Sequence, residues 1–150
     1  MDNGVIKKIQ KKILDLLPES HRNNPGRLLV DSCSEVSRLV ASWIIALDKS
    51  SRVLIIKGIN VCDTKKAHDI LIVINGNNNV YIIDPTIWQF FPQSKSILVA
   101  MLEDVDTAYE KIKEVYGGEW SVSEESIQLD EITKNKYLDV ISRNVIENLK

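Results

Sequence analysis

Two apolar segments separated by an asparagine-rich turn constrain the fold of this chain more than any other feature. Residues 69–74 (DILIVI) and residues 80–83 (VYII) are rich in β-branched residues, and the sequence NGNNN separates them. This pattern predicts a β-hairpin. Because both segments are apolar at nearly every position, we expect the sheet that contains them to be covered on both faces.

Helical patterns lie on both sides of the hairpin. Apolar residues at steps of three and four predict a first helix over residues 6–17, which Pro18 ends, and a last helix that starts near Asp130. Further elements are expected between them: strands over residues 53–57 (closed by Gly58) and 96–102, and a helix over residues 105–115, capped by Asp104 or Asp106 and stopped by Gly117 and Gly118. This order of elements predicts an α+β fold, and the length fits one domain, residues 1–150.

The segment DSCSEVSRLVASWIIALD predicts a central buried helix. Asp31 and Ser32 are good N-cap candidates, so Cys33 falls in the first turn. The apolar stripe of this helix comprises Val36, Leu39, Val40, Trp43, Ile44 and Leu47. We therefore expect Trp43 to lie in the core.

Composition excludes several classes of protein. With 44% apolar and 27% charged residues the chain is typical of a globular protein, and a net charge of −2 argues against nucleic acid as a partner. Two cysteines are too few for a disulfide framework or a structural zinc site. The N-terminus lacks the pattern of a signal peptide, and no apolar run is long enough to span a membrane. We expect a cytoplasmic protein, or one delivered to another cell by a route without a signal.

Cys33 is the first candidate for chemistry. Unsatisfied N–H groups and the positive end of the helix dipole favour a thiolate at the start of a helix, where a nucleophile is expected. A lone cysteine at such a position is also typical of a small packed side chain. Cys62 lies in the loop-like segment VCDTKK and has no such placement, so we interpret it as structural.

His68 and Asp84 lie at corresponding ends of the hairpin strands. Symmetric pairing about Gly76 places them directly opposite each other, whereas a five-residue loop over residues 75–79 shifts the register by two. In either register both side chains lie on the same face, within reach of a hydrogen bond. A carboxylate that orients an imidazole, which activates a thiol, forms a nucleophilic triad. Cys33, His68 and Asp84 are therefore the candidate catalytic residues.

The segments DSCSEVS, KAHDILIVING and VYIIDPTIWQF together resemble the Cys, His, Asp core of the papain-like and transglutaminase-like superfamily, over roughly residues 28–92. The strand that ends in D-P-T with an aromatic residue after it is similar to bacterial protein-glutamine deamidases and papain-fold toxins. The resemblance implies a central helix that starts at the nucleophilic cysteine and packs on an antiparallel sheet. It implies Cys33 as nucleophile, His68 as general base and then acid, and Asp84 as orienter, with no cofactor and no metal. A protein or peptide substrate and an inhibitor or immunity protein would be the partners.

The residues that would bind substrate are less well marked. Papain-type members have an oxyanion-hole glutamine upstream of the nucleophile, whereas this chain has no glutamine between Gln10 and Cys33. Backbone N–H groups near Cys33, or nearby polar side chains, would have to serve instead. The candidates for oxyanion or substrate binding are Ser32, Asn24, Trp88 and Gln89, although an aromatic cluster such as the one around Trp88 is more often part of a core.

The resulting hypothesis is a thiol-dependent amide hydrolase or acyl transferase that deamidates glutamine side chains of proteins. A cysteine peptidase is the close alternative, because the same three groups cut either amide. A non-enzymatic interaction module, with the lysine-bearing first helix or the last helix docking a partner, is the alternative from another class. A metal site formed by Cys33, Cys62 and His68 is a weaker idea, because three ligands without a second cysteine or histidine pair are few.

Overall fold

The computed structural model describes residues 3–23, 25–26, 28–123, 127 and 129–150. Its α-helices are α1 (Asn3–Leu14), α2 (Cys33–Leu47), α3 (Val105–Tyr116) and α4 (Glu131–Leu149). Its strands are β1 (Arg52–Ile59), β2 (His68–Ile74), β3 (Val80–Asp84), β4 (Leu98–Leu102) and β5 (Glu119–Ser123). Short 3-10 turns are η1 (Glu19–His21), η2 (Val61–Asp63) and η3 (Ile87–Gln89). Among the described residues the fold is therefore α+β, as the sequence predicts.

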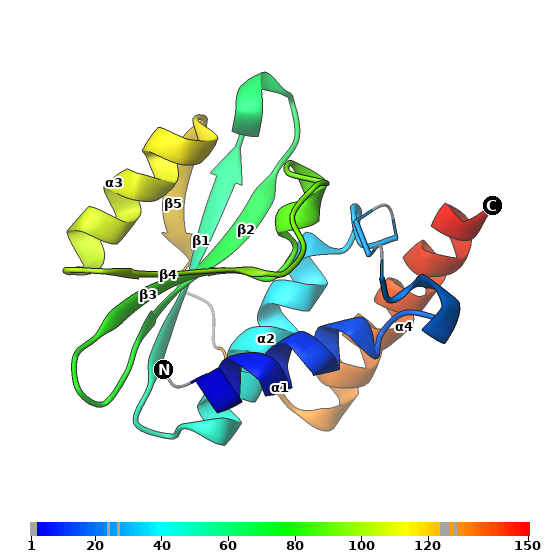
Figure 1. The fold of residues 1–150 in the computed structure, drawn as a ribbon, viewed down its shortest axis with the longest axis horizontal. Coiled ribbons are helices and arrows are strands. Elements are labelled where there is room, and N and C mark those ends of the chain that lie inside the picture. The colour runs from blue at the N-terminus through cyan, green and yellow to red at the C-terminus, as the bar shows by residue number, and fades with distance from the viewer. Residues whose placement is uncertain (1–2, 24, 27, 124–126, 128) are drawn as a thin grey trace.

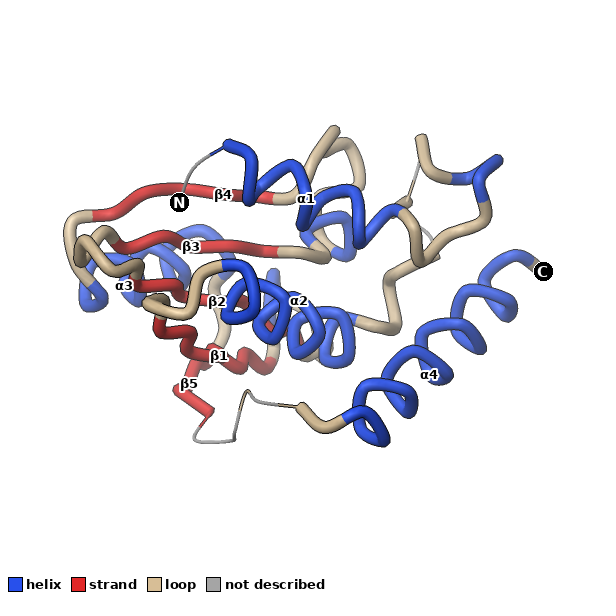
Figure 2. Tube along the Cα trace, turned by 90° about the horizontal axis from the view of Figure 1, so that it is seen from below, coloured by secondary structure: helices blue, strands red, loops and turns tan. Residues whose placement is uncertain are grey.

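A five-stranded antiparallel sheet in the order β4-β3-β2-β1-β5 separates two layers of helix (Figures 1 and 2). Side chains alternate along each strand, so the apolar runs of β2 and β3 supply both faces. Leu71 and Val73 pack in the cluster that contains residues of α1, α2 and α4, whereas Ile70 and Ile72 pack with residues of α3. The expectation of a sheet covered on both faces is thus confirmed.

The hairpin register places the candidate residues. Ile74 pairs with Val80, and the N–H of Asn75 bonds the carbonyl of Asn79 at 3.0 Å, so the loop has five residues. This is the shifted register of the two that the sequence allows, so His68 and Asp84 are not directly opposite. His68 instead pairs with Gly58 of β1.

The helix α2 is buried along its first half and emerges from the core near its end. Val36, Val40 and Ile44 are fully buried, as the apolar stripe predicts. The expectation that Trp43 lies in the core is only partly met, because its ring is half-buried and Lys12 of α1 covers it, with Nζ 5.3 Å from the ring centroid. Leu47, the last residue of α2, is 39% exposed.

The strand β5 and the length of β1 are not what the sequence predicts. Gly58 was expected to close β1, yet it lies inside the strand, and β5 pairs alongside it. A Cβ at Gly58 would lie 2.6 Å from the ring of Trp120 in β5, so the glycine makes room for this indole. Two other elements have bounds that differ from the prediction. The helix α1 ends at Leu14, before the buried Leu17, and the strand β4 begins at Leu98 rather than at Ser96.

The helices α3 and α4 start at aspartate caps. Asp104 accepts a hydrogen bond from Thr107 N at 2.7 Å, and Asp130 accepts one from Thr133 N at the same distance. The helix α3 extends one residue beyond the predicted end, and this added residue, Tyr116, is buried, whereas Val115 is 48% exposed. In the part of the chain that the structure describes, no helix is both long enough and apolar enough to cross a membrane.

Candidate active site

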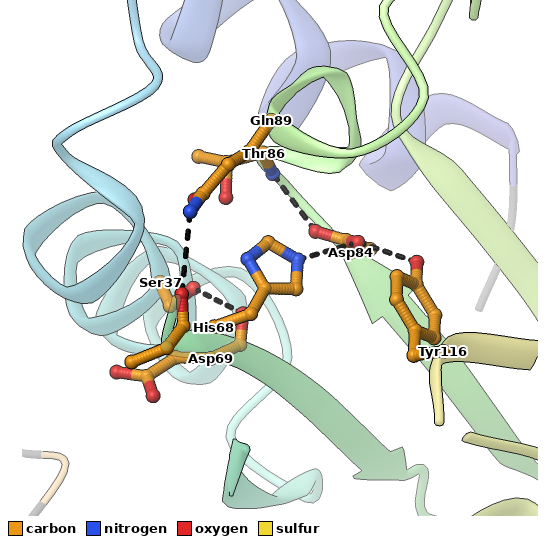
Figure 3. A network of polar contacts seen from close by, with 8 residues as sticks. Ser37, His68, Asp69, Asp84, Thr86, Gln89 and Tyr116 are labelled. Atoms are coloured by element: carbon orange, nitrogen blue, oxygen red, sulfur yellow. Dashed lines mark hydrogen bonds and ion pairs between the residues drawn. The ribbon is translucent and has the colours of Figure 1, made fainter. Parts of the chain in front are cut away.

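His68 and Asp84 form a buried pair at one end of the sheet. The Nε2 atom of His68 lies 2.8 Å from Oδ2 of Asp84, and both residues are 0% exposed (Figure 3). Their positions at the first residue of β2 and the last residue of β3 bring them together, because both have the strand parity that faces α3. The shared face expected from the sequence is therefore enough for contact even though the register is shifted.

Asp84 has two further hydrogen-bond donors. The hydroxyl of Tyr116, the last residue of α3, donates to Oδ2 at 2.5 Å, and the N–H of Thr86 donates to Oδ1 at 3.1 Å (Figure 3). Burial, together with the negative charge of Asp84 and the bond to it, raises the pKa of Tyr116 above its ordinary value, so its hydroxyl keeps its proton as a donor. The carboxylate is thereby fixed on both oxygens, and it in turn fixes the imidazole ring.

Cys33 is the third candidate residue, and its side chain interacts with His68. It is the first residue of α2, its side chain is half-buried, and its interaction with His68 contributes to the pKa of the imidazole. The Nδ1 atom of His68 is buried and makes no hydrogen bond of ordinary geometry to any described residue. With Nε2 held by Asp84, Nδ1 is the nitrogen that is left to exchange a proton with the Cys33 sulfur.

The balance of forces on His68 favours the imidazolium. Burial by itself lowers the pKa of His68, but the charge of Asp84, the hydrogen bond to Asp84 and the interaction with Cys33 outweigh burial and raise it to about 10. A pKa in this range favours the imidazolium at neutral pH, the form in which both ring nitrogens carry a proton. An imidazolium next to a sulfur favours the thiolate, which is the nucleophilic form of cysteine.

The turn after β3 covers the imidazole. Phe90 contacts His68 edge to face, with ring centroids 5.0 Å apart, and Gln89 donates through Nε2 to the carbonyl of Ala67 at 3.2 Å. The Oε1 atom of Gln89 and the Oγ1 atom of Thr86 are buried and have no partner among the described residues. Gln89 therefore lies next to the pair, as expected for a residue that follows the aspartate.

Two of the other expected substrate-binding residues are not available to a substrate. Ser32 is 0% exposed, and its hydroxyl accepts a hydrogen bond from Asn144 of α4 at 3.1 Å, because α4 packs against the start of α2. Trp88 is 2% exposed, and its indole donates to the carbonyl of Ser94 at 2.7 Å, which makes it a core residue. Asn24 lies outside the described residues.

Cys62 lies near the site in an unusual backbone conformation. Its φ angle is 54°, in the left-handed region, and neighbouring Asn60 and Asp63 also have positive φ. Burial, followed by the negative charges of Asp63 and Asp84, raises the pKa of the Cys62 thiol. Both carboxylates disfavour the thiolate form of Cys62. An imidazolium beside a cysteine has the opposite effect, because its positive charge favours the thiolate.

Several residues of the site escaped sequence analysis. Tyr116 stands four residues after Ile112 and eight after Ala108, so helical spacing alone predicts its burial, but nothing in the sequence predicts that its hydroxyl meets Asp84. Arg38 and Asp69 form a buried ion pair at 2.8 Å between α2 and β2, and their separation of 31 residues hides it in the sequence.

The described residues contain no group of three or more histidine, cysteine, aspartate or glutamate side chains that could hold a metal ion. Among known proteins, no family model, no curated sequence and no solved structure matches this chain. The contacts around His68 are therefore the feature of this chain that bears on its function.

Proposed function

We propose that this chain is a cysteine-dependent amide hydrolase or acyl transferase of the papain-like or transglutaminase-like type, and that its substrate is the side-chain amide of a protein glutamine. The observation that carries the proposal is the environment of His68. One ring nitrogen is bonded to a buried carboxylate at 2.8 Å, the other has no hydrogen-bond partner among the described residues, and the half-buried Cys33 interacts with the same imidazole. This is the order of contacts that a thiol nucleophile, its base and its orienter need.

The reaction would proceed in two steps. The Cys33 thiolate attacks the carbonyl carbon of the amide, and the imidazolium of His68 gives its Nδ1 proton to the departing nitrogen, so ammonia leaves and a thioester remains. Neutral His68 then takes a proton from water, whose oxygen attacks the thioester. The carboxylic acid leaves, and the proton returns the pair to its starting state.

Backbone N–H groups at the start of α2 would stabilise the negative oxygen of the intermediate. Ser32 makes no side-chain capping bond to this helix, because its hydroxyl is bonded to Asn144 instead. The first N–H groups of α2 are thus not used by a side-chain cap, and they lie beside the sulfur that attacks. This arrangement supplies the role that an upstream glutamine has in papain-type members.

Two substrates separate deamidation from proteolysis. A blocked Gln–Gly dipeptide reports ammonia release, and unfolded casein, followed by mass spectrometry, reports either conversion of glutamine to glutamate or new chain ends. We expect ammonia from the dipeptide and glutamate in intact casein with the wild type, and neither with Cys33→Ala. New casein termini that depend on Cys33 would instead identify a peptidase. Equal behaviour of wild type and Cys33→Ala on both substrates would refute the enzymatic proposal.

A non-enzymatic interaction module is the second candidate, and the surface of α4 favours it. Ile132 is 70% exposed and Ile146 is 55% exposed, so this helix presents large apolar side chains to solvent. The two candidates differ in the reactivity of Cys33. An enzyme needs a sulfur that iodoacetamide alkylates well below the ordinary thiol pKa of about 8.5, whereas an interaction module has no such need.

A further inference from the structure

We infer that Arg38 is a positioning residue for the reaction proposed above: through Ser34 and Asp69 it fixes Cys33 relative to His68. The inference rests on the proposed function, since it concerns the distance between the nucleophile and its base. Neither residue of the ion pair contacts a reacting atom in the mechanism, so both would act through their sequence neighbours.

Arg38 contacts the residues that directly follow the two candidate catalytic residues in the chain. Its Nη1 atom donates to Oδ2 of Asp69 at 2.8 Å, to the carbonyl of Ser34 at 3.0 Å and to Oγ of Ser34 at 2.7 Å. Ser34 follows Cys33 in the chain, and Asp69 follows His68. One guanidinium group thus connects the residue after the nucleophile to the residue after the base.

A second contact fixes the same two elements. The hydroxyl of Ser37, one turn after Cys33, donates to the backbone carbonyl of Asp69 at 3.1 Å. Figure 3 shows Ser37 and Asp69 on the side of the imidazole away from Asp84, so the backbone next to His68 is held on one side and its ring is bonded on the other. We call the contacts of Ser34, Ser37, Arg38 and Asp69 the helix–strand clamp.

The burial of the clamp argues for positioning rather than for stability as its main contribution. Arg38 is 7% exposed and Asp69 is 5% exposed. Removing two charges from water costs nearly as much as their attraction returns, so an apolar pair would hold the elements together as well. What an apolar pair lacks is the directional geometry of charge-assisted hydrogen bonds. Such geometry matters where a sulfur and a ring nitrogen must keep a fixed separation.

The test is the rate of alkylation of Cys33 by iodoacetamide across a pH series, with each modified cysteine quantified by peptide mass spectrometry. Cys62 is an internal reference in every sample, because its raised pKa predicts slower alkylation near neutral pH than that of a thiolate. The variants are Arg38→Met, Asp69→Asn and the double variant. Ile13→Ala, a truncation in the core of α1, is the control for lost stability without a change in the clamp.

Positioning and a simple effect of charge predict different results. If the clamp positions Cys33, all three variants lose reactivity of Cys33 near neutral pH by roughly 10- to 100-fold, and the double variant is not rescued. If the two charges act only through their field, Arg38→Met and Asp69→Asn shift the pH midpoint in opposite directions, and the double variant returns to the wild-type profile. That second pattern, or unchanged profiles, would overturn the inference.

Two further points keep the test decisive. Where Arg38→Met fails to fold, Ser37→Ala removes one contact of the clamp and no charge, and we expect a smaller loss in the same direction. Retained wild-type reactivity in that variant would count against the clamp. A wild-type Cys33 that lacks reactivity near neutral pH would refute the proposed function itself, whereas a reactive wild type with unaffected variants would refute positioning alone.

Discussion

Asp84 is the residue on which the buried polar groups of the site converge. Its two carboxylate oxygens accept from His68, Tyr116 and Thr86, and it is 0% exposed. A buried carboxylate has to be fully satisfied, because each missing donor leaves charge without water or protein to solvate it. These three hydrogen bonds stabilise the carboxylate in its buried position. The contribution of each donor can be measured by substituting that residue.

Removal of the Tyr116 hydroxyl should lower the free energy of unfolding more than removal of a hydroxyl that bonds a neutral partner. We expect Tyr116→Phe to lower the free energy of unfolding by about 1.5–3 kcal/mol, the range for hydrogen bonds to charged groups. Tyr109→Phe, on the same helix, is the matched control, because Tyr109 donates to the backbone carbonyl of Trp120. Urea denaturation measures both. Equal losses in the two variants would contradict a special role of the Asp84 contact.

The charge of His68 should be visible in the pH dependence of stability. Its pKa is raised from about 6.5 in the unfolded chain to about 10 in the fold. The folded state therefore binds more protons than the unfolded state between these values, so the unfolding free energy falls as pH rises through this window. The contribution is fully present below the lower value and lost above the upper one.

The measurement is a series of urea midpoints from pH 6 to pH 10, values that roughly bracket the two pKa limits. We expect His68→Gln to remove this decline relative to the wild type, whereas His21→Gln, a change of the exposed histidine in η1, should retain it. A wild-type curve parallel to that of His68→Gln would mean that His68 is neutral in the fold. The imidazolium in the proposed mechanism would then have no basis.

At the scale of elements, the contact between β1 and β5 depends on one missing side chain. Gly58 lies under the ring of Trp120, and a Cβ there would meet ring carbons at 2.6 to 2.7 Å. We expect Gly58→Ala to destabilise the protein by about 1–3 kcal/mol, as overpacking does. Gly76→Ala is the comparison, because a Cβ there would lie 2.6 Å from the hydroxyl and 3.0 Å from the Cβ of Ser50, an exposed loop residue, so we expect a smaller loss than at Gly58.

Denaturation of these variants is best combined with Trp120→Ala. If the collision is the cause, Gly58→Ala should cost much less in the Trp120→Ala background than in the wild type, a non-additivity expected of residues in contact. Additive losses would show that Gly58 matters for another reason, such as backbone conformation. Its place in the middle of β1 would then need a different explanation.

The elements that the sequence predicts well are those with local causes. Strands β2 and β3 follow from apolar runs and a turn, α3 and α4 begin at aspartates that bond the third N–H, and the parity of His68 and Asp84 follows from the strand period. The sequence does not predict β5, because the five residues EWSVS are too short a segment for their alternating pattern to indicate a strand. It is a strand only because β1 offers it an edge.

At the scale of the whole molecule, sequence patterns do not predict the contacts of the site whose two residues lie far apart in the chain. Arg38 meets Asp69 across 31 residues, and Tyr116 meets Asp84 across 32. Neither contact leaves a local pattern, since a buried arginine or tyrosine looks in sequence like one on any amphipathic helix. The contact between His68 and Asp84 was predictable because each residue is placed by its own strand, whereas the residues that hold the pair depend on how the layers pack.

The last helix also makes contacts with residues far away in the sequence, and these contacts lead to a prediction about the segment before Cys33. Asn144 of α4 donates through Nδ2 to the carbonyl of Asp31 and to the hydroxyl of Ser32, both at 3.1 Å. Asn148, one turn later, donates to the carbonyl of Leu28 at 3.2 Å. The C-terminal helix therefore holds the backbone that leads into Cys33, more than 100 positions away in the chain.

We expect Asn144→Ala to loosen this segment more than it destabilises the fold. The loss of two hydrogen bonds should lower the free energy of unfolding by about 1–3 kcal/mol. Hydrogen–deuterium exchange should rise in residues 28–36 and remain unchanged in β2 and β3. Asn135→Ala, an exposed position on the same helix, should leave both measurements unchanged. Uniformly faster exchange throughout the chain would show that Asn144 supports global stability and does not specifically hold the start of α2.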